Sequence, residues 1–199
     1  MMSQQPQIQR FWSWFESHLT DIANACEQSD AAWLNHAITP QVRRLGSSIN
    51  WEFGPYHHPD QTFVLSPTIR ENLPITRAAA AAAPVIDGWH FLPARPRKPL
   101  RQLVFEAHGI TVSAENWQYL LTAYNGGEFV DVEIRLDEPI SHAPLFAELV
   151  VEALVGEQRR LERIGHVTAL PSSAQSFAQR TDQLTDIQHL YDHLNLVLR

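Results

Sequence analysis

The sequence is poor in cysteine and in basic residues, and it lacks long apolar runs. Each of these properties argues against a class of protein. It contains one cysteine, Cys26, so an intrachain disulfide is impossible. There are 15 Lys and Arg against 22 Asp and Glu, and a net charge of -7 argues against nucleic-acid binding, which depends on basic surfaces. No window approaches the roughly 18 apolar residues that a membrane-spanning helix needs. We therefore expect neither nucleic acid nor a membrane as a partner.

Motifs for catalysis and nucleotide binding are also missing. The chain has no Gly-x-x-x-x-Gly-Lys-Ser/Thr loop, no Gly-x-Gly-x-x-Gly turn and no His-Glu-x-x-His pair. Ser66 precedes Pro67 and does not lie in the Gly-x-Ser-x-Gly elbow of hydrolases. The first residues lack the charged and then apolar run of a secretory signal, so we expect a cytoplasmic location. The catalytic residues, if any, stay unknown, and we predict no cofactor and no metal site.

Two stretches of the chain show the same predicted order of strand, strand, helix and strand. In residues 49–95, apolar side chains alternate from Ile49, and an alanine-rich helix follows the second strand. In residues 117–170, a hairpin turns at Asn-Gly-Gly, residues 125–127, and an apolar helix begins near Pro144. The pattern predicts two ββαβ units.

The remaining segments frame these two units. Residues 6–48 are predicted to form N-terminal helices, the first over residues 6–28. Residues 96–116 are predicted to be a basic linker and a hairpin, and residues 171–199 a Ser-rich link and a C-terminal helix. We predict a single α+β domain, residues 1–199, in which helices pack on one face of a mostly antiparallel sheet. One continuous sheet is favoured over two abutting ones.

The only concentrated positive charge lies in the linker, at Arg95-Pro-Arg97-Lys98-Pro-Leu-Arg101. Two prolines among four cations indicate an exposed connection between folded parts. We interpret this stretch as a solvated loop in preference to a binding patch, because runs of like charge are usually solvated.

Five short motifs follow one another along the chain in an order and spacing that are moderately specific. They are Phe11-Trp-Ser-Trp-Phe15, Ile49-Asn-Trp-Glu-Phe53, Phe63-Val-Leu-Ser-Pro67, Ala83-Pro-Val-Ile-Asp-Gly-Trp-His-Phe91 and Ala153-Leu-Val-Gly-Glu157. Over about residues 10–170 the chain resembles a family of uncharacterised bacterial proteins. The resemblance implies an α+β fold in a cytoplasmic bacterial protein and assigns no activity. Thr68-Ile69-Arg70 stands where the family pattern has a glycine, so that turn is expected to differ.

The polar side of the predicted sheet supplies the candidate site. If helices cover one face, the other face collects charged and imidazole side chains: Glu52, His90, Glu106, His108, Asp131, Glu133 and Arg135. Antiparallel sheets often have one solvated face, and this is the preferred interpretation of the row. The alternative is a surface that recognises a ligand or a protein. Glu106 and His108 share a face of one predicted strand and are suitable metal ligands, but no third ligand is identifiable.

Two hypotheses from different functional classes follow. The leading hypothesis is a non-enzymatic cytoplasmic protein that binds another protein as a regulator or inhibitor, since an acidic domain suits a basic partner. The alternative is a small-molecule-binding protein or an unassigned hydrolase that uses the polar sheet face around His90, Glu106 and His108. A closed pocket containing those residues would favour the alternative.

Overall fold

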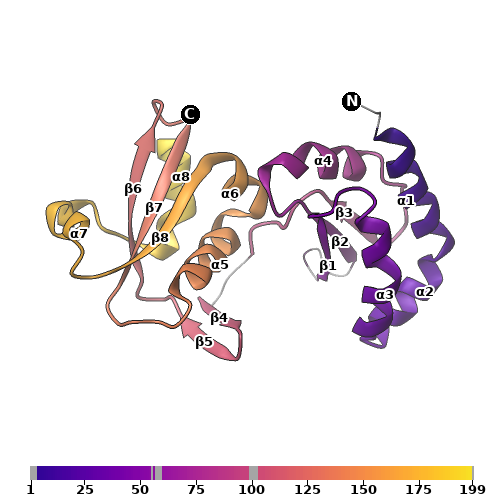
Figure 1. Ribbon diagram of the computed structural model, residues 1–199, viewed down its shortest axis with the longest axis horizontal. Coiled ribbons are helices and arrows are strands. Elements are labelled where there is room, and N and C mark those ends of the chain that lie inside the picture. The colour runs from indigo at the N-terminus through magenta and orange to yellow at the C-terminus, as the bar shows by residue number, and fades with distance from the viewer. Residues whose placement is uncertain (1–3, 55, 57–59, 99–102, 199) are drawn as a thin grey trace. The chain divides into compact units, whose positions relative to one another are not determined.

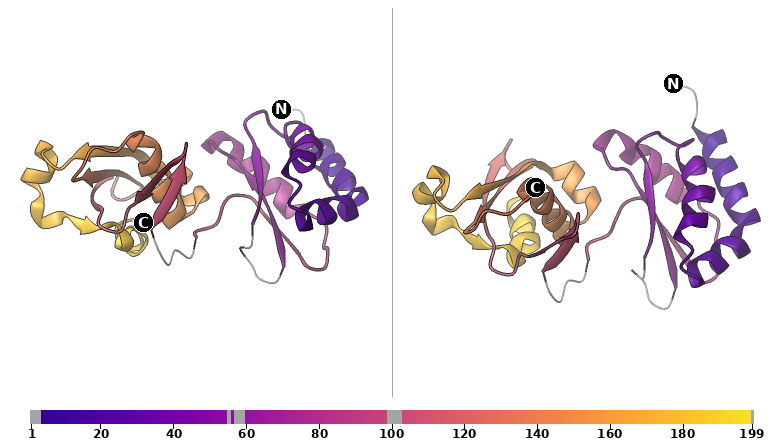
Figure 2. Two further views of the ribbon diagram at one scale, coloured as in Figure 1. Left: turned by 90° about the horizontal axis from the view of Figure 1, so that it is seen from below. Right: turned by 60° about the horizontal axis from the view of Figure 1, so that its bottom comes forward.

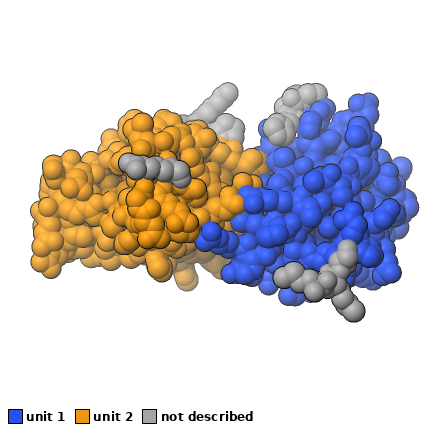
Figure 3. Space-filling model, turned by 90° about the horizontal axis from the view of Figure 1, so that it is seen from above, with its two compact units in different colours: residues 1–95 blue, residues 96–199 orange. Residues whose placement is uncertain are grey.

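The computed structural model describes residues 4–54, 56, 60–98 and 103–198 and has an α+β fold (Figure 1). A single domain is expected from the sequence, whereas the chain divides into two compact units, residues 1–95 (unit 1) and residues 96–199 (unit 2) (Figure 3). Each unit has a hydrophobic core of its own. The division falls where the first predicted ββαβ stretch meets the basic linker.

Unit 1 begins with the helices α1 (Gln5–Ser17), α2 (Leu19–Glu27) and α3 (Ala31–Val42). The predicted single helix over residues 6–28 is interrupted at His18, whose φ of -112° and ψ of 10° depart from helical values. The Asp30 side chain caps α3 by accepting a hydrogen bond from the Trp33 backbone N–H over 3.0 Å. The predicted N-terminal helical region is therefore present, and its first predicted helix is divided in two at His18.

The sheet of unit 1 contains three strands in the order β1-β2-β3. The strands are β1 (Asn50–Gly54), β2 (Gln61–Ser66) and β3 (Trp89–Leu92). β1 is antiparallel to β2, and β3 is parallel to β2. The connection between β2 and β3 contains the 3-10 turn η1 (Arg70–Asn72) and the helix α4 (Leu73–Ala81). The predicted order of strand, strand, helix and strand is confirmed here.

An aromatic core attaches the N-terminal helices to one face of this sheet (Figure 2). The ring of Phe63 in β2 is stacked 6.2 Å from that of Phe11 and lies 5.3 Å from that of Phe15, both in α1. The Trp51 indole N–H in β1 donates to the Thr39 hydroxyl of α3 over 3.0 Å. Such ring pairs add specific geometry to the burial of apolar area, so α1 and α3 are both fixed to the Phe63 face.

Unit 2 holds the remaining elements. They are β4 (Val104–Ala107), β5 (Ile110–Ser113), β6 (Gln118–Tyr124), β7 (Phe129–Leu136), α5 (Ala143–Val155), α6 (Glu157–Arg163), β8 (Ile164–Pro171), α7 (Gln175–Gln179), η2 (Thr181–Gln183), β9 (Thr185–Asp186), η3 (Ile187–His189) and α8 (Leu190–Val197). β4 and β5 form a two-stranded sheet, and the other strands form a four-stranded sheet in the order β8-β7-β6-β9. Only β7 and β8 are parallel in it.

The prediction of one continuous sheet is wrong, because the described residues form three separate sheets. Each ββαβ stretch brings its own covering helix, α4 or α5, and each sheet is buried against a core within its own unit. The three-stranded sheet of unit 1 and the four-stranded sheet of unit 2 can therefore each bury an apolar face without sharing strands.

The core of unit 2 lies on one face of the four-stranded sheet. Val130, Val132 and Ile134 of β7 are fully buried there with Phe146 of α5 and Leu190 of α8. The segment that contains α7 lies on the opposite side of the sheet from α5 (Figure 1). The predicted Ser-rich link therefore has structure of its own, and it borders the polar side of the sheet.

Candidate functional site

The predicted row of polar side chains is divided among three sheets. Glu52 and His90 lie in the sheet of unit 1, Glu106 and His108 in the β4–β5 hairpin, and Asp131, Glu133 and Arg135 in β7. The row was predicted for one continuous sheet. Because that sheet does not exist, these residues do not form a single sheet face.

In unit 1, both predicted residues have close partners. Arg95 donates through Nε to Oε2 of Glu52 over 3.0 Å, and the Tyr56 hydroxyl donates to Oε1 of the same carboxylate. Nε2 of His90 lies 2.9 Å from Oδ2 of Asp60. Both ion pairs are partly exposed, and pairs of this kind contribute little to stability. We interpret both ion pairs as local contacts that hold the ends of the strands in place.

In the hairpin of unit 2, Glu106 and His108 do not share a strand face as predicted. Glu106 lies in β4 and is exposed, whereas His108 lies in the turn with a φ of 52°. The turn begins directly after Ala107, so the alternation of the strand stops one residue before the histidine. The His108 ring centroid is 5.5 Å from that of His142. In the described part of the chain, no three His, Cys, Asp or Glu side chains are placed to hold a metal ion.

Asp131 and Glu133 lie on a more structured surface, the polar face of the four-stranded sheet. We define the polar face as the side of β6 and β7 away from the core, formed by Gln118, Thr122, Tyr124, Asp131, Glu133 and Arg135. The strand register pairs Thr122 with Asp131 and Gln118 with Arg135. Side chains of directly paired residues lie on one side of a sheet, so this surface follows from the pairing of the two strands.

Asp131 is fixed at an irregularity in the sheet. The pairing of β7 with β8 shifts register between Val130 and Val132, as in a β-bulge. At this point Oδ1 of Asp131 accepts a hydrogen bond from the His166 backbone N–H over 2.8 Å and lies 3.4 Å from Nδ1 of the same histidine. A Cβ atom on Gly165 would stand 2.6 Å from that oxygen. Glycine at this position therefore makes room for the carboxylate.

Tyr124 gives the polar face an exposed aromatic ring. It is 46% exposed at the end of β6. A hydrogen bond to Asp131 and the charge of that carboxylate raise the pKa of the Tyr124 hydroxyl, with further increases from burial and from the charge of Glu133, while Arg180 lowers it. The hydroxyl therefore lies in a net negative potential produced by the two carboxylates.

The polar face also contains groups with unused hydrogen-bonding capacity. Oε2 of Glu133 and Nε of Arg135 are buried and have no hydrogen-bond partner among the described residues. Arg180, which follows α7, donates through Nη1 to the Thr122 hydroxyl over 2.9 Å and through Nη2 to the Leu121 carbonyl. The segment after α7 thus borders a surface beneath which one buried carboxylate oxygen has no hydrogen-bond partner among the described residues.

The predicted row of polar side chains did not include three further residues of this region, Tyr124, His166 and Arg180. The position of Tyr124 was predictable from the sequence. It lies two residues after Thr122, and therefore on the same side of the strand, and it directly precedes the Asn-Gly-Gly turn. The positions of His166 and Arg180 were not predictable, since a bulge and a non-repetitive segment bring them to the sheet.

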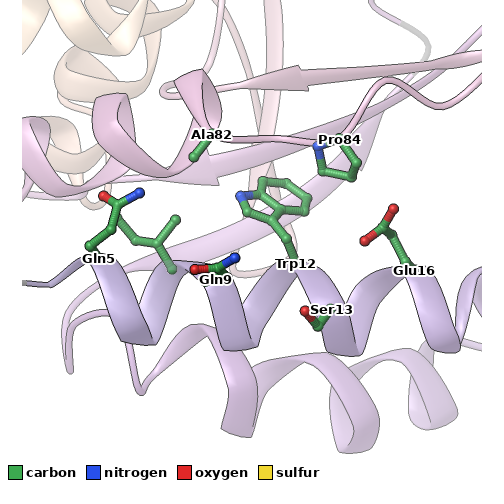
Figure 4. Close-up of a pocket in the computed structure, with 8 residues that line it drawn as sticks. Gln5, Gln9, Trp12, Ser13, Glu16, Ala82 and Pro84 are labelled. Atoms are coloured by element: carbon green, nitrogen blue, oxygen red, sulfur yellow. The ribbon is translucent and has the colours of Figure 1, made fainter.

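Unit 1 contains a pocket of about 240 Å³ between α1 and the chain after α4 (Figure 4). It is lined by Gln5, Ile8, Gln9, Trp12, Ser13, Glu16, Ala82 and Pro84. Trp12 forms much of its inner wall and donates its indole N–H to the Ala79 carbonyl over 2.8 Å. Glu16 is the one carboxylate in the lining, and no imidazole or thiol accompanies it. This lining does not assemble a nucleophile with a base.

Comparisons with known proteins add no family or activity to these observations. No family matches the chain, and neither a curated protein nor a solved structure is significantly similar to it. The resemblance to a bacterial family therefore stays a prediction. None of the helices in the described ranges has the length and hydrophobicity of a transmembrane segment.

Proposed function

We propose that this is a non-enzymatic cytoplasmic protein that binds another protein, and that the polar face of unit 2 receives a cationic side chain of that partner. The observation that carries the proposal is the grouping of an exposed tyrosine with two carboxylates. The charge of Asp131 and, to a smaller extent, that of Glu133 raise the pKa of the Tyr124 hydroxyl. One oxygen of Glu133 is without a hydrogen-bond partner among the described residues.

This combination suits the side chain of Lys or Arg. An aromatic ring attracts a cation to its face, and carboxylates accept the short charge-assisted hydrogen bonds that a guanidinium or ammonium group donates. The bordering Arg180 is itself bound to Thr122 and Leu121, so it limits where a second cation can lie. The net charge of -7 adds long-range attraction for a basic partner.

In this proposal the protein acts on its partner by binding to it and does not catalyse a reaction. The role expected of such a protein is that of a regulator or an inhibitor of the protein it binds, as the sequence hypothesis states. The support for this role is the position of the two carboxylates beside the partly exposed ring of Tyr124 on the polar face.

The test is a capture experiment from native lysate with a double variant, Asp131→Asn with Glu133→Gln. Both changes remove charge and keep an acceptor oxygen, so the hydrogen bond from His166 to residue 131 can persist. The matched control is Glu16→Gln with Asp21→Asn, which makes the same charge change at exposed positions of unit 1. We expect wild type and control to recover one stoichiometric protein, which salt elutes, and the double variant to lose it.

Equal recovery of that protein by all three forms would contradict the proposal. A metabolite or metal that co-purifies with the wild type and is lost in a Glu106→Ala, His108→Ala variant would support the small-molecule alternative instead. Tyr124→Ala separates the ring from the charges, because it leaves both carboxylates in place. We expect it to weaken capture by about threefold to tenfold, as for an exposed cation–π contact.

A further inference from the structure

The basic linker is not simply solvated as the sequence predicts. Arg95 pairs with Glu52 in unit 1, and Arg101 lies outside the described residues. The backbone N–H of Lys98 donates to the Ala153 carbonyl of α5 over 2.9 Å. This bond fixes the start of the linker to unit 2, so the neighbouring Arg97 has a defined position.

Two guanidinium groups converge on one aromatic ring in α8. The Cζ atom of Arg97 lies 4.0 Å from the centroid of the Tyr191 ring, and the Cζ atom of Arg159, in α6, lies 4.9 Å from it. The separation of the two guanidinium carbons therefore cannot exceed the sum of these distances. Arginines from the linker and from α6, 62 positions apart in sequence, thus form one cationic cluster with Tyr191.

The charges of this cluster are not neutralised within the described chain. No carboxylate there forms an ion pair with Arg97 or Arg159. Among the described residues, the Arg159 side chain has one hydrogen-bond partner, the neutral amide oxygen of Asn195, at 2.6 Å. By contrast, Arg160, the next residue, makes a two-pronged ion pair with Glu148. Two like charges placed together without a counterion cost free energy, which a bound anion would recover.

A hollow of about 390 Å³ lies beside Arg159. It is lined by Gln158, Arg159, Glu162, Arg163 and Leu198. The Gln158 amide donates to Glu162 over 3.2 Å, and Glu162 is the one carboxylate of the lining. The hollow is large enough for a small tetrahedral anion with its hydration, and the Arg159 guanidinium borders it.

From this geometry we infer that Arg97 and Arg159 form a binding site for a phosphate-type oxyanion on the α6–α8 side of unit 2. The planar guanidinium donates two parallel N–H groups that match two oxygens of a phosphate. The Tyr191 ring holds both guanidinium groups in place by cation–π contact, which reduces the side-chain entropy lost on binding. This site is independent of the polar face, and its test does not depend on the proposed protein partner.

The experiment is calorimetric titration of the full-length chain at low ionic strength with inorganic phosphate. We expect saturable binding by the wild type, and a loss of affinity of about tenfold or more in Arg97→Gln and in Arg159→Gln. Arg43→Gln is the matched control, because Arg43 is exposed at the end of α3 in unit 1. Glu162→Gln is expected to increase the affinity, since it removes the negative charge that borders the hollow.

Two sources of the anion are distinguished with O-phosphoserine and serine as further probes. Tighter binding of O-phosphoserine than of inorganic phosphate, with no binding of serine, supports a phosphorylated side chain as the ligand. Equal binding of the two phosphates supports a free phosphate or small phosphorylated metabolite. Either result supports the site.

Absence of saturable binding of all three probes to the wild type would overturn the inference, as would equal affinity in Arg159→Gln and the wild type. A second readout guards against a variant that fails to fold. Phosphate should raise the melting temperature of the wild type and of Arg43→Gln, because it binds the folded state alone, and should leave that of folded Arg159→Gln unchanged.

Discussion

The backbone N–H of His166 donates to Oδ1 of Asp131 over 2.8 Å, and Gly165 provides the space in which that oxygen lies. This hydrogen bond joins the polar side of β7 to the irregular start of β8. It also fixes the carboxylate that raises the pKa of the Tyr124 hydroxyl. A backbone position without a side chain thus determines where a charged group of the proposed partner surface lies.

Gly165→Ala is expected to displace this carboxylate and to lower the free energy of unfolding by about 1 kcal/mol, the usual net value of one hydrogen bond. The reason is that the new Cβ would stand 2.6 Å from Oδ1 of Asp131. Urea unfolding at neutral pH measures the effect. In an Asp131→Ala background the same change should cost much less, and an equal cost in both backgrounds would contradict the explanation.

Trp12→Phe is expected to lower the free energy of unfolding by about 2 kcal/mol, because it leaves a small cavity and removes a buried hydrogen bond. Trp12 is 4% exposed, and its indole N–H donates to the Ala79 carbonyl over 2.8 Å. Chemical denaturation followed by far-ultraviolet circular dichroism measures the loss. Trp33→Phe is the control, since Trp33 is only partly buried. Similar losses in both variants would argue against a specific role for the indole bond.

Acidification is expected to destabilise unit 2 through His193. Burial lowers the pKa of this imidazole below its ordinary value, and its Nδ1 lies 2.9 Å from the Tyr119 hydroxyl. The unfolded chain therefore binds the proton more readily, so the stability contribution is complete above the unfolded pKa of about 6.5 and declines as the pH falls below it.

The measurement for His193 is urea unfolding of the full chain at several pH values, followed by far-ultraviolet circular dichroism. His193→Gln should have a shallower pH dependence than the wild type. His36→Gln, at an exposed position of α3 in unit 1, should not change the slope. Parallel slopes for the wild type and His193→Gln would exclude this histidine as the cause.

Arg160→Lys is expected to lower the free energy of unfolding by about 1 kcal/mol, although it conserves charge, because lysine cannot reproduce the planar fork. Arg160 donates through Nε and Nη2 to the two oxygens of Glu148, each over 2.7 Å, and through Nη1 to the Ile164 carbonyl over 2.8 Å. Thermal unfolding provides the comparison. Arg43→Lys, at an exposed site, should be close to neutral, and an equal effect there would remove the geometric argument.

Local patterns in the sequence predicted the elements well where apolar side chains recur at a regular spacing. The second strand predicted within residues 49–95 is β2, Gln61–Ser66, and the predicted helix near Pro144 begins at Ala143. Where the chain departs from such spacing, prediction was weaker. The break at His18 and the short elements between Pro171 and Leu190 are examples, because no regular apolar spacing marks them.

The candidate site was predictable only in part. Alternation along β7 placed Asp131 and Glu133 on the polar side, and both lie there. The inclusion of Glu52, His90, Glu106 and His108 in the same row required one continuous sheet, which the structure does not have. The alternation of apolar and polar residues indicates on which side of its strand a side chain lies. It does not indicate which strands pair with each other.

The sequence by itself therefore determined the α+β class, the order of strand, strand, helix and strand in the first stretch, and the side of β7 on which Asp131 and Glu133 lie. These properties depend on the spacing of apolar residues within short segments. Only the tertiary structure decided that the chain divides into two units and that Arg97 and Arg159 meet at Tyr191. Such contacts join residues far apart in sequence, and they form because each unit buries its own core.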